Sequence, residues 1–426
     1  MESRQEVGRP YTTDERHTKH MKNRFLVTST LAAAGLAVTG RAQEQPATEH
    51  LAPKERIGSV VSLDVSTHKD ILDLVVATET EIGPTLTHRR SKDGGRTWSP
   101  DTKVEMSGTT ISNAMRGLDP QIAAQDDHIF VVWTTPGEGQ HGVGPFGTAT
   151  SDDGGKTWRK GTNPADDDSK KGHAFIESIV DQSGVLHVVW LETRATRGLF
   201  AATSRDFGKT WAKTVTVDAL TCECCWNKML SLRPGETHLL YRDKDPRDMA
   251  IAVTSDSGVS WKRLATVGDF KWPINACPFT GGGLAVTGSG AGEKLHSTIF
   301  SGMKDHRGVS YFASKDNGNT WSEPLALGEG RGQHSDLASM GRDLVVVYDV
   351  TDPDDGTVVG VKRSGDEGAT WSAFTRLSPH GSKADFPRVV SVKGRFVAFW
   401  TEKDKDGMVA WRMKDLGAQE AKTDAR

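Results

Sequence analysis

The stretch Ser151-Asp-Asp-Gly-Gly-Lys-Thr-Trp158 decides the fold, because its pattern, Ser-x-Asp-x-Gly-x-Thr-Trp, occurs six times in the chain. The copies are Ser91–Trp98, Ser151–Trp158, Ser204–Trp211, Thr254–Trp261, Ser314–Trp321 and Ser364–Trp371. The copy at Thr254–Trp261 exchanges the two hydroxyl residues, and the others keep all five fixed positions. A five-point pattern that returns after about 50 residues predicts a repeat architecture.

Each fixed position of the octet has a role in a tight turn. The Asp side chain accepts hydrogen bonds from nearby backbone groups, and Gly supplies the positive φ that the turn needs. The Ser and Thr hydroxyls add local bonds to the backbone, and the Trp ring can lie between neighbouring sheets. We therefore expect the six Asp residues to be structural and not catalytic.

The octet resembles the Asp-box, or bacterial neuraminidase (BNR) repeat, of sialidases and other β-propellers. In that family the box joins the third and fourth strands of a blade, on the face opposite the active site. The resemblance implies an all-β propeller of the sialidase superfamily.

The spacing of the repeats sets the number of blades. Second strands rich in β-branched and aromatic residues are expected at Leu74–Thr78, Phe130–Thr134, Leu186–Leu191, His238–Arg242, His296–Ser301, Leu344–Tyr348 and Arg395–Thr401. The last unit, Ala384–Met413, has three strands and no octet, and the segment before Gly58 could supply its fourth strand. With about 55 residues per unit, we predict a single seven-bladed β-propeller over residues 45–415, followed by a polar tail at 416–426. A six-bladed ring of the sialidase type is the alternative.

The N-terminal residues predict export. A basic start at Met21–Arg24, an apolar stretch from Phe25 to Val38 and small residues at 40–42 are typical of a secretory signal peptide. Residues 1–20 are a dispensable prefix, so residues 1–42 are expected to fall outside the propeller. The mature chain is then periplasmic or secreted and carries no membrane anchor.

Composition limits the partners. Charged residues make up 26% of the chain and the formal net charge is −3, which does not favour nucleic acid or an anionic membrane surface. A glycan or another small anionic ligand fits better, and the oligomeric state is not predicted.

Any site is expected on the top face, where second strands end and the next first strands begin. The polar residues at these positions are Glu79, Glu192, Arg242, Asp243, Asp349, Glu402, Arg56, Asp119, His173, Cys225, Cys277, His334, Asp385 and Arg388.

The resemblance to sialidases implies roles for some of these residues. Sialidases hold the substrate carboxylate with three arginines, and Arg56, Arg242 and Arg388 are the candidates here. Asp119 or Glu192 would be the acid/base. Tyr241 and Tyr348 are the candidate nucleophiles, although either ring could instead pack in a sheet.

The four cysteines lie in two successive connections on this face, as Cys222, Cys224 and Cys225 in one and Cys277 in the next. A disulfide from the cluster to Cys277 would join two blades, which suits an exported protein. The alternative is a thiolate site for copper(I) or zinc, with Met229, His173 or His334 as further ligands.

Three functions follow from these features. The first is an exported sialidase-superfamily propeller with a ligand-binding site on the top face. If it is an enzyme, the resemblance implies an exo-sialidase-like glycoside hydrolase. The alternatives are a copper- or zinc-binding propeller and a non-catalytic protein-binding scaffold.

Overall fold

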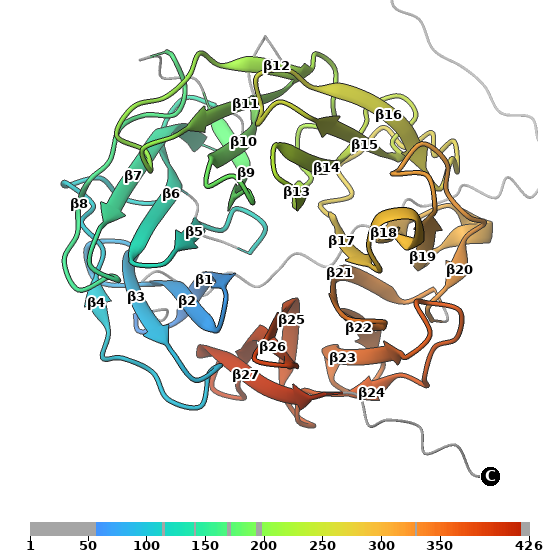
Figure 1. Ribbon diagram of the computed structural model, residues 1–426. Coiled ribbons are helices and arrows are strands. Elements are labelled where there is room, and N and C mark those ends of the chain that lie inside the picture. The colour runs from blue at the N-terminus through green and yellow to red at the C-terminus, as the bar shows by residue number, and fades with distance from the viewer. Residues whose placement is uncertain are drawn as a thin grey trace, which may run out of the picture. The chain divides into compact units, whose positions relative to one another are not determined.

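The computed structural model describes residues 57–112, 116–139, 142–167, 172–192, 198–328 and 330–418. These residues form seven antiparallel sheets arranged around an axis, and the chain passes through them in order (Figure 1). The predicted seven-bladed β-propeller is therefore confirmed, and the six-bladed alternative is wrong. The signal peptide, its prefix, Arg56 and most of the segment before Gly58 lie outside the described residues.

Each blade of the first half is a four-stranded meander. The strands of blades 1 and 2 are β1 (Val60–His68), β2 (Ile71–Thr78), β3 (Thr85–Ser91), β4 (Thr102–Lys103), β5 (Gln121–Gln125), β6 (His128–Pro136), β7 (Val143–Ser151) and β8 (Arg159–Lys160). Those of blades 3 and 4 are β9 (His173–Val180), β10 (Leu186–Glu192), β11 (Gly198–Ser204), β12 (Val215–Asp218), β13 (Lys228–Arg233), β14 (Glu236–Arg242), β15 (Met249–Thr254) and β16 (Lys262–Val267).

The second half continues the pattern until the last blade. The strands of blades 5 and 6 are β17 (Gly282–Thr287), β18 (Lys294–Ser301), β19 (Gly308–Ser314), β20 (Leu325–Ala326), β21 (Gly332–Met340), β22 (Asp343–Asp352), β23 (Gly356–Ser364) and β24 (Thr375–Arg376). Blade 7 has three described strands, β25 (Lys383–Val392), β26 (Arg395–Lys403) and β27 (Val409–Gly417). All seven expected second strands lie within β2, β6, β10, β14, β18, β22 and β26.

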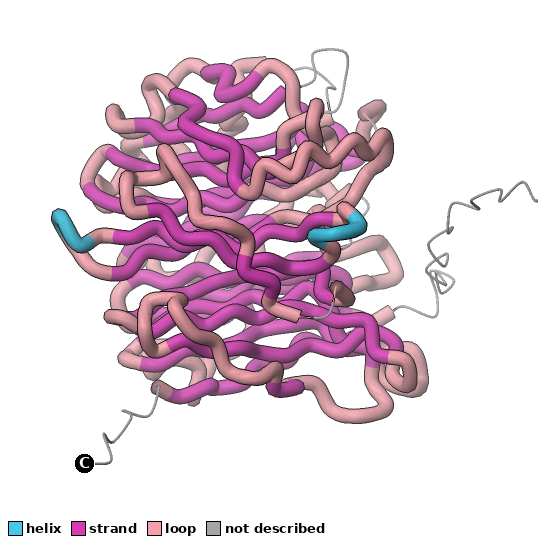
Figure 2. Tube along the Cα trace, turned by 90° about the vertical axis from the view of Figure 1, so that its right-hand side faces the viewer, coloured by secondary structure: helices cyan, strands magenta, loops and turns pink. Residues whose placement is uncertain are grey.

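Loops gather on the two faces of the ring, as the side view shows (Figure 2). The octets turn on the bottom face, and the first strands begin on the top face. Two short 3-10 helices lie in such loops, η3 (Gly290–Gly292) and η4 (Lys304–His306). The described residues contain no helix with the length and apolar character that a membrane span requires.

The octets form the same hydrogen bonds in every copy. In blade 2, Ser151 Oγ donates to Asp153 Oδ1 over 2.8 Å and accepts from the Gly155 N–H over 2.9 Å. Asp153 also accepts from the backbone N–H and the hydroxyl of Thr157 at 2.9 and 2.6 Å. These bonds stabilise the carboxylate and lower the pKa of Asp153. The predicted structural role of the octet agrees with this geometry.

The hydrophobic core is divided among the seven seams between blades. Six of the buried clusters join side chains of two neighbouring blades, the seventh extends over blades 2, 3 and 4, and the octet Trp rings contribute to several of them. The ring centres of Trp158 and His88 of blade 1 are 5.3 Å apart, and those of Trp371 and Tyr311 of blade 5 are 5.1 Å apart. Burial against a neighbour thus joins the blades.

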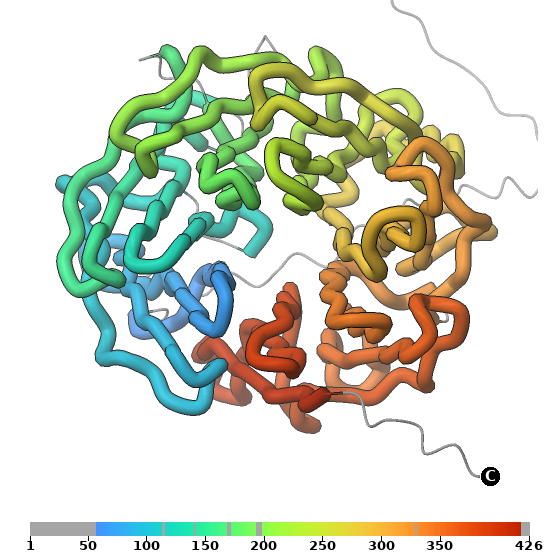
Figure 3. The backbone as a smooth tube through the Cα atoms, in the orientation of Figure 1, coloured from blue at the N-terminus to red at the C-terminus, as the bar shows by residue number. Residues whose placement is uncertain are grey.

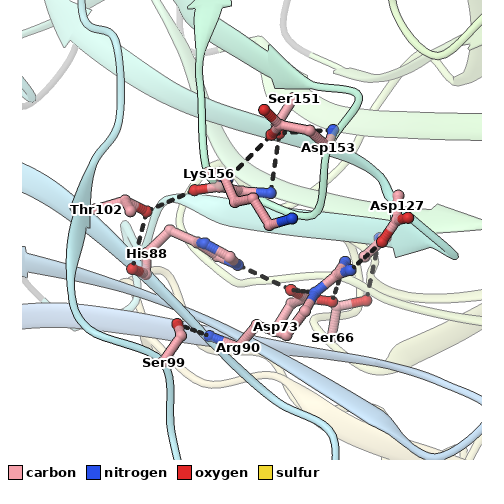
Figure 4. Close-up of polar contacts among 12 residues, drawn as sticks. Ser66, Asp73, His88, Arg90, Ser99, Thr102, Asp127, Ser151, Asp153 and Lys156 are labelled. Atoms are coloured by element: carbon pink, nitrogen blue, oxygen red, sulfur yellow. Dashed lines mark hydrogen bonds and ion pairs between the residues drawn. The ribbon is translucent and has the colours of Figure 1, made fainter.

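Polar contacts reinforce the seam between blades 1 and 2 (Figure 4). Asp73 accepts from Arg90 over 2.7 Å and lies 2.8 Å from His88 Nε2. Arg90 also reaches Asp127, in the first turn of blade 2, over 2.8 Å. Since Asp73, His88 and Arg90 are all buried, this network completes the hydrogen bonding of groups that water cannot reach.

The ring closes between blades 7 and 1, which lie side by side (Figure 3). Their shared core includes Phe399 and Leu74, and Arg395 donates to the backbone oxygens of Asp93 and Gly94 at 2.6 and 3.2 Å. Closure protects sheet edges that would otherwise be open to pairing.

Candidate functional site

One level of the central channel is defined by equivalent residues of the seven first strands. In blades 1 to 6, strand pairing places each of these residues at the same position relative to the octet of its own blade. Blade 7 has no octet and is aligned through Trp400. This channel ring consists of Asp64, Gln121, Glu177, Lys228, Gly283, Asp336 and Arg388. It therefore holds carboxylates and cations at one height around the axis.

The carboxylates of the channel ring connect neighbouring blades. Asp64 accepts from the Ile122 N–H over 3.0 Å, and Asp336 accepts from the Val389 N–H over 3.1 Å. Lys228 Nζ lies 3.2 Å from Asp336 Oδ1. The lysine side chain of blade 4 thus reaches blade 6 across blade 5, where Gly283 has no side chain. These residues thus hold the inner strands together.

Burial makes the channel ring electrostatically sensitive. Desolvation raises the pKa of Asp64 to about 7, against the opposing effect of Arg388. Burial also raises the pKa of Glu177. Burial disfavours the charged form of Lys228, but Asp336 and Glu177 outweigh this effect and raise its pKa. The charges of the channel ring therefore influence one another across several blades.

A group of side chains adjoins this ring through Arg388; we call it the central cluster (Arg116, Asp119, His334, Asp349, Phe386 and Arg388). Arg116 Nε lies 3.1 Å from Asp119 Oδ1, and Arg388 Nη2 lies 3.5 Å from Asp119 Oδ2. Arg116 Nη2 donates to the Phe386 carbonyl over 2.8 Å. Two arginines of blades far apart in sequence thus meet at one carboxylate.

His334 and Asp349 form the second half of the central cluster. His334 Nδ1 lies 2.6 Å from Asp349 Oδ2, and the N–H groups of His334 and Phe386 donate to the same carboxylate at 3.0 and 3.1 Å. The imidazole stacks on Phe386 with ring centres 4.0 Å apart. Its side chain is 13% exposed, so the ring is held firmly but is not sealed from solvent.

Aromatic rings surround the central cluster. The ring centre of Trp226 lies 5.7 Å from that of Phe386, 5.3 Å from that of His334 and 6.0 Å from that of Phe279. Phe175, Phe279 and Phe386 adopt positive φ angles of 52°, 52° and 49°. Bulky residues rarely take this conformation, and such strain is concentrated at functional sites.

A separate group on this face contains Asp167, His173 and Glu192. His173 Nδ1 lies 3.1 Å from Glu192 Oε2, and Nε2 lies 3.6 Å from Asp167 Oδ1. The buried imidazole also stacks on Phe146 at 4.6 Å.

The predicted sialidase residues are distributed over several places. Asp119 and Arg388 meet in the central cluster, whereas Glu192 lies in the group around His173. The Tyr241 hydroxyl donates to Asp218 over 2.7 Å, and burial raises its pKa well above the usual range. The roles of all these residues stay predictions.

Arg242 is placed in the wall of blade 4. Its guanidinium donates to the carbonyls of Arg247 and Phe300 at 2.8 and 3.0 Å and lies 5.6 Å from the Trp272 ring. These partners of Arg242 thus lie in blades 4 and 5, those of Arg388 include Asp119, and the predicted arginine clamp stays a prediction.

The expected disulfide is confirmed as Cys224–Cys277, which joins the connections before blades 4 and 5. Cys222 and Cys225 are buried free thiols whose Sγ atoms are 3.6 Å apart. A hydrogen bond from Cys225, aided by Arg247, lowers the pKa of Cys222 to about 6 against the effect of burial. The disulfide leaves two of the four sulfurs as thiols, and metal binding stays a prediction.

Two surface pockets lie among outer strands and not at the central cluster. The larger, of about 580 Å³, is lined by residues of β3, β4 and the octet of blade 2. The smaller, of about 370 Å³, lies beside the octet of blade 3. Neither contains a residue of the predicted site.

Sequence reasoning missed Arg116 and Phe386. Arg116 lies three residues before Asp119, in a connection without a repeated pattern, so only that spacing could have indicated the pair. Phe386 precedes Pro387, and nothing in the sequence indicates its positive φ or its stacking on His334.

Comparison with known proteins identifies the family to which the chain belongs. A family described as "BNR repeat-like domain" matches residues 52–273. A PL25 ulvan lyase, solved bound to -[GlcA(1-4)Rha3S]-, is 11% identical with a TM-score of 0.58 over 85% of this chain and 94% of the lyase. At this identity the likeness shows the fold alone. No curated protein matches the chain.

Sialidases also appear among the similar structures. A Hadza microbial sialidase is 19% identical over 69% of this chain and 64% of its own, with a TM-score of 0.47. The NanB sialidase from Streptococcus pneumoniae is 13% identical over 85% of this chain and 69% of its own, with a TM-score of 0.47.

Proposed function

The chain belongs to the family of proteins with a BNR repeat-like domain, and from this premise we propose that it is an exported propeller that binds an acidic glycan at the central cluster. One observation carries the proposal: Arg116 and Arg388 meet at Asp119, and Phe386 connects them to the His334–Asp349 pair. Cations, a proton-transfer pair and an aromatic ring are thus brought together.

Recognition of an anion rests on the arginines. A guanidinium has five N–H donors; in Arg116 only Nη2 donates to the Phe386 carbonyl, and Nε forms an ion pair with Asp119 over 3.1 Å. Its buried Nη1 has no hydrogen-bond partner in the described part of the chain. A ligand carboxylate or sulfate would complete this hydrogen bonding, and a planar carboxylate suits a guanidinium especially well.

Recognition of a sugar rests on the rings. Phe386 is half-buried and offers an apolar surface against which a sugar ring can pack, Trp226 supports it from the core, and the neighbouring polar groups can orient the sugar hydroxyls. The sugar unit bound to the ulvan lyase of the same fold is acidic, and this supports an acidic glycan as the ligand class.

His334 is the proposed proton-transfer residue if the glycan is cleaved. Asp349 faces Nδ1 over 2.6 Å, so a neutral imidazole carries its proton there and leaves Nε2 to accept or deliver one. The backbone donors to Asp349 keep this carboxylate in place. The proposal assigns no role as nucleophile to Tyr241, whose hydroxyl is bound to Asp218.

Calorimetric titration with uronate-bearing, sialylated and neutral oligosaccharides tests the binding. We expect acidic glycans alone to bind, and Arg116→Met to weaken them by about tenfold to a hundredfold through the lost charged hydrogen bonds. The matched control is His128→Ala, which removes a His–Asp pair of 2.8 Å on the bottom face and should bind normally. Equal affinity for neutral glycans, or unchanged affinity in Arg116→Met and Arg388→Met, would overturn the proposal.

Turnover tests the role of His334 separately. New reducing ends and unsaturated uronate products distinguish hydrolysis from elimination. His334→Ala should lower either rate by about a hundredfold to ten-thousandfold while affinity stays within about threefold. Binding without any turnover would leave the glycan-binding function intact and refute the proton-transfer role.

A further inference from the structure

Four sulfur atoms form a cluster that is exposed at one end and buried at the other. Cys277 lies in an exposed segment with Asn275 and Ala276, whereas its disulfide partner Cys224 is 3% exposed. The free thiols of Cys222 and Cys225 are both 1% exposed. An external reagent therefore meets the disulfide before it meets either thiol.

Cys222 is positioned to attack this disulfide. Its Sγ lies 3.5 Å from Cys224 Sγ and 3.6 Å from Cys225 Sγ. Reacting atoms in a productive ground state lie about 3–3.5 Å apart, so Cys222 is within reach of Cys224 without a large movement.

Arg247 provides the charge that a thiolate at Cys222 needs. Its Nη1 donates to Cys222 Sγ over 2.9 Å, and its side chain is largely buried. No carboxylate of the described residues lies within ion-pair distance of this guanidinium. Because a buried cation requires a counter-charge, this contact favours the thiolate form of Cys222. Arg242, which donates to the Arg247 carbonyl over 2.8 Å, is a positioning residue.

We propose that the four cysteines form a thiol–disulfide exchange site, in which Cys222 opens the Cys224–Cys277 bond and exposes a reactive thiolate at Cys277 to a disulfide on another molecule. This activity is independent of the proposed glycan binding. The buried pair, Cys222 and Cys225, stores the two reducing equivalents, and the exposed pair, Cys224 and Cys277, transfers them.

The first half of the reaction delivers the thiolate. The Cys222 thiolate forms a bond to Cys224 Sγ, the Cys224–Cys277 bond breaks, and its electron pair leaves on Cys277. The Cys277 thiolate then attacks the external disulfide, forms a mixed disulfide and releases one external thiolate.

The second half restores the exposed disulfide. Cys225 loses its proton and attacks Cys222 Sγ, which forms the Cys222–Cys225 disulfide and releases Cys224 as a thiolate. Cys224 then attacks Cys277 and releases the second external thiolate. In total, two buried thiols are oxidised, one external disulfide is reduced and two protons are released.

The test uses native full-length protein with 5,5′-dithiobis(2-nitrobenzoate) as the disulfide probe. We expect two equivalents of coloured thiolate per chain, and peptide mapping should then find Cys222–Cys225 beside Cys224–Cys277, without probe attached to the protein. A stable probe adduct on Cys222 or Cys225 would overturn the proposal, since it would mean direct access to the buried thiols.

Two variants test the order of events. Cys277→Ser removes the exposed sulfur, so release should slow by about tenfold or more although an extra thiol is present; a rate equal to wild type would refute the relay. Arg247→Met keeps all four cysteines and should also slow release by about tenfold, with the same final yield. Thermal unfolding confirms that each variant is folded.

Metal analysis of the same preparation completes the test. Less than one equivalent of copper or zinc per chain, together with two titratable thiols after denaturation, would support the exchange reaction. Four thiols with one equivalent of copper or zinc would overturn it and support the metal-binding alternative.

Discussion

The bottom-face turns repeat one another residue by residue, whereas the first strands place side chains of differing chemistry around the channel. Every octet closes the same bonds between its Ser, Asp, Gly and Thr positions, as in blades 2 and 6. At the channel ring, the equivalent positions hold acids, bases, an amide and a glycine. Repetition therefore marks the parts that build the ring, and divergence marks the parts that face its axis.

The two regions also differ in how their charges are held. The carboxylate of an octet is exposed and surrounded by donors, which lower the pKa of Asp153. The carboxylate of Asp64 is buried, and its pKa is raised to about 7. Stability comes from satisfied turns, whereas burial in the channel raises the pKa of a carboxylate toward neutral pH. Three variants test this difference.

The largest effect is expected at a glycine of the bottom face. Gly368 has a φ of +84°, and a Cβ there would lie 1.9 Å from the Tyr311 hydroxyl of blade 5. Gly368→Ala should lower the free energy of unfolding by about 4 kcal/mol, through backbone strain together with the clash. Chemical denaturation measures this change.

Gly381→Ala is the matched control for that variant. Gly381 has a similar φ of +78°, but nothing lies within 4 Å of its added Cβ. Only the backbone strain remains in this variant, so the free energy of unfolding should fall by about 1 kcal/mol. Equal losses in the two variants would contradict the packing of octet glycines against the preceding blade.

An intermediate effect is expected at Asp64, and it depends on pH. An acid whose pKa is raised in the folded chain binds its proton more tightly there than in the unfolded chain. Its contribution to stability therefore falls as the pH rises from about 4 to about 7. Asp64→Asn removes this titration while its amide oxygen can still accept from Ile122. Between pH 5 and 7, the free energy of unfolding of wild type should fall by about 2 kcal/mol more than that of the variant, as measured by urea unfolding.

Asp126→Asn provides a control of opposite sign. A hydrogen bond from Lys69 lowers the pKa of this exposed acid, so its contribution is lost as the pH falls and not as it rises. The same pH slope in wild type and Asp64→Asn would refute the buried state of the channel carboxylate.

The smallest effect is expected within an octet. Ser151→Ala leaves the Gly155 N–H and Asp153 without the buried hydroxyl, which should cost about 1 kcal/mol (Figure 4). The exposed Ser99 accepts from the Arg90 N–H over 3.0 Å, and Ser99→Ala should stay within about 0.5 kcal/mol. A larger loss at Ser99 would contradict the importance assigned to the octet hydroxyl.

The candidate site could be predicted only in part. Asp119 and Arg388 were identified because they lie at or near the starts of first strands, which a propeller brings to one face. Their meeting with Arg116 was not predictable, because it joins residues about 270 positions apart through side-chain conformations. The disulfide was anticipated from the cluster to Cys277, but its choice of Cys224 over Cys222 or Cys225 depends on local backbone direction.

The repeated octets and second strands by themselves determined the strand order within a blade and the number of blades, because both are local patterns that need only neighbouring residues. The tertiary structure alone decided which charges share the channel and which sulfur atoms touch. Those contacts depend on closure of the ring and on burial, and no local pattern in the chain encodes either one.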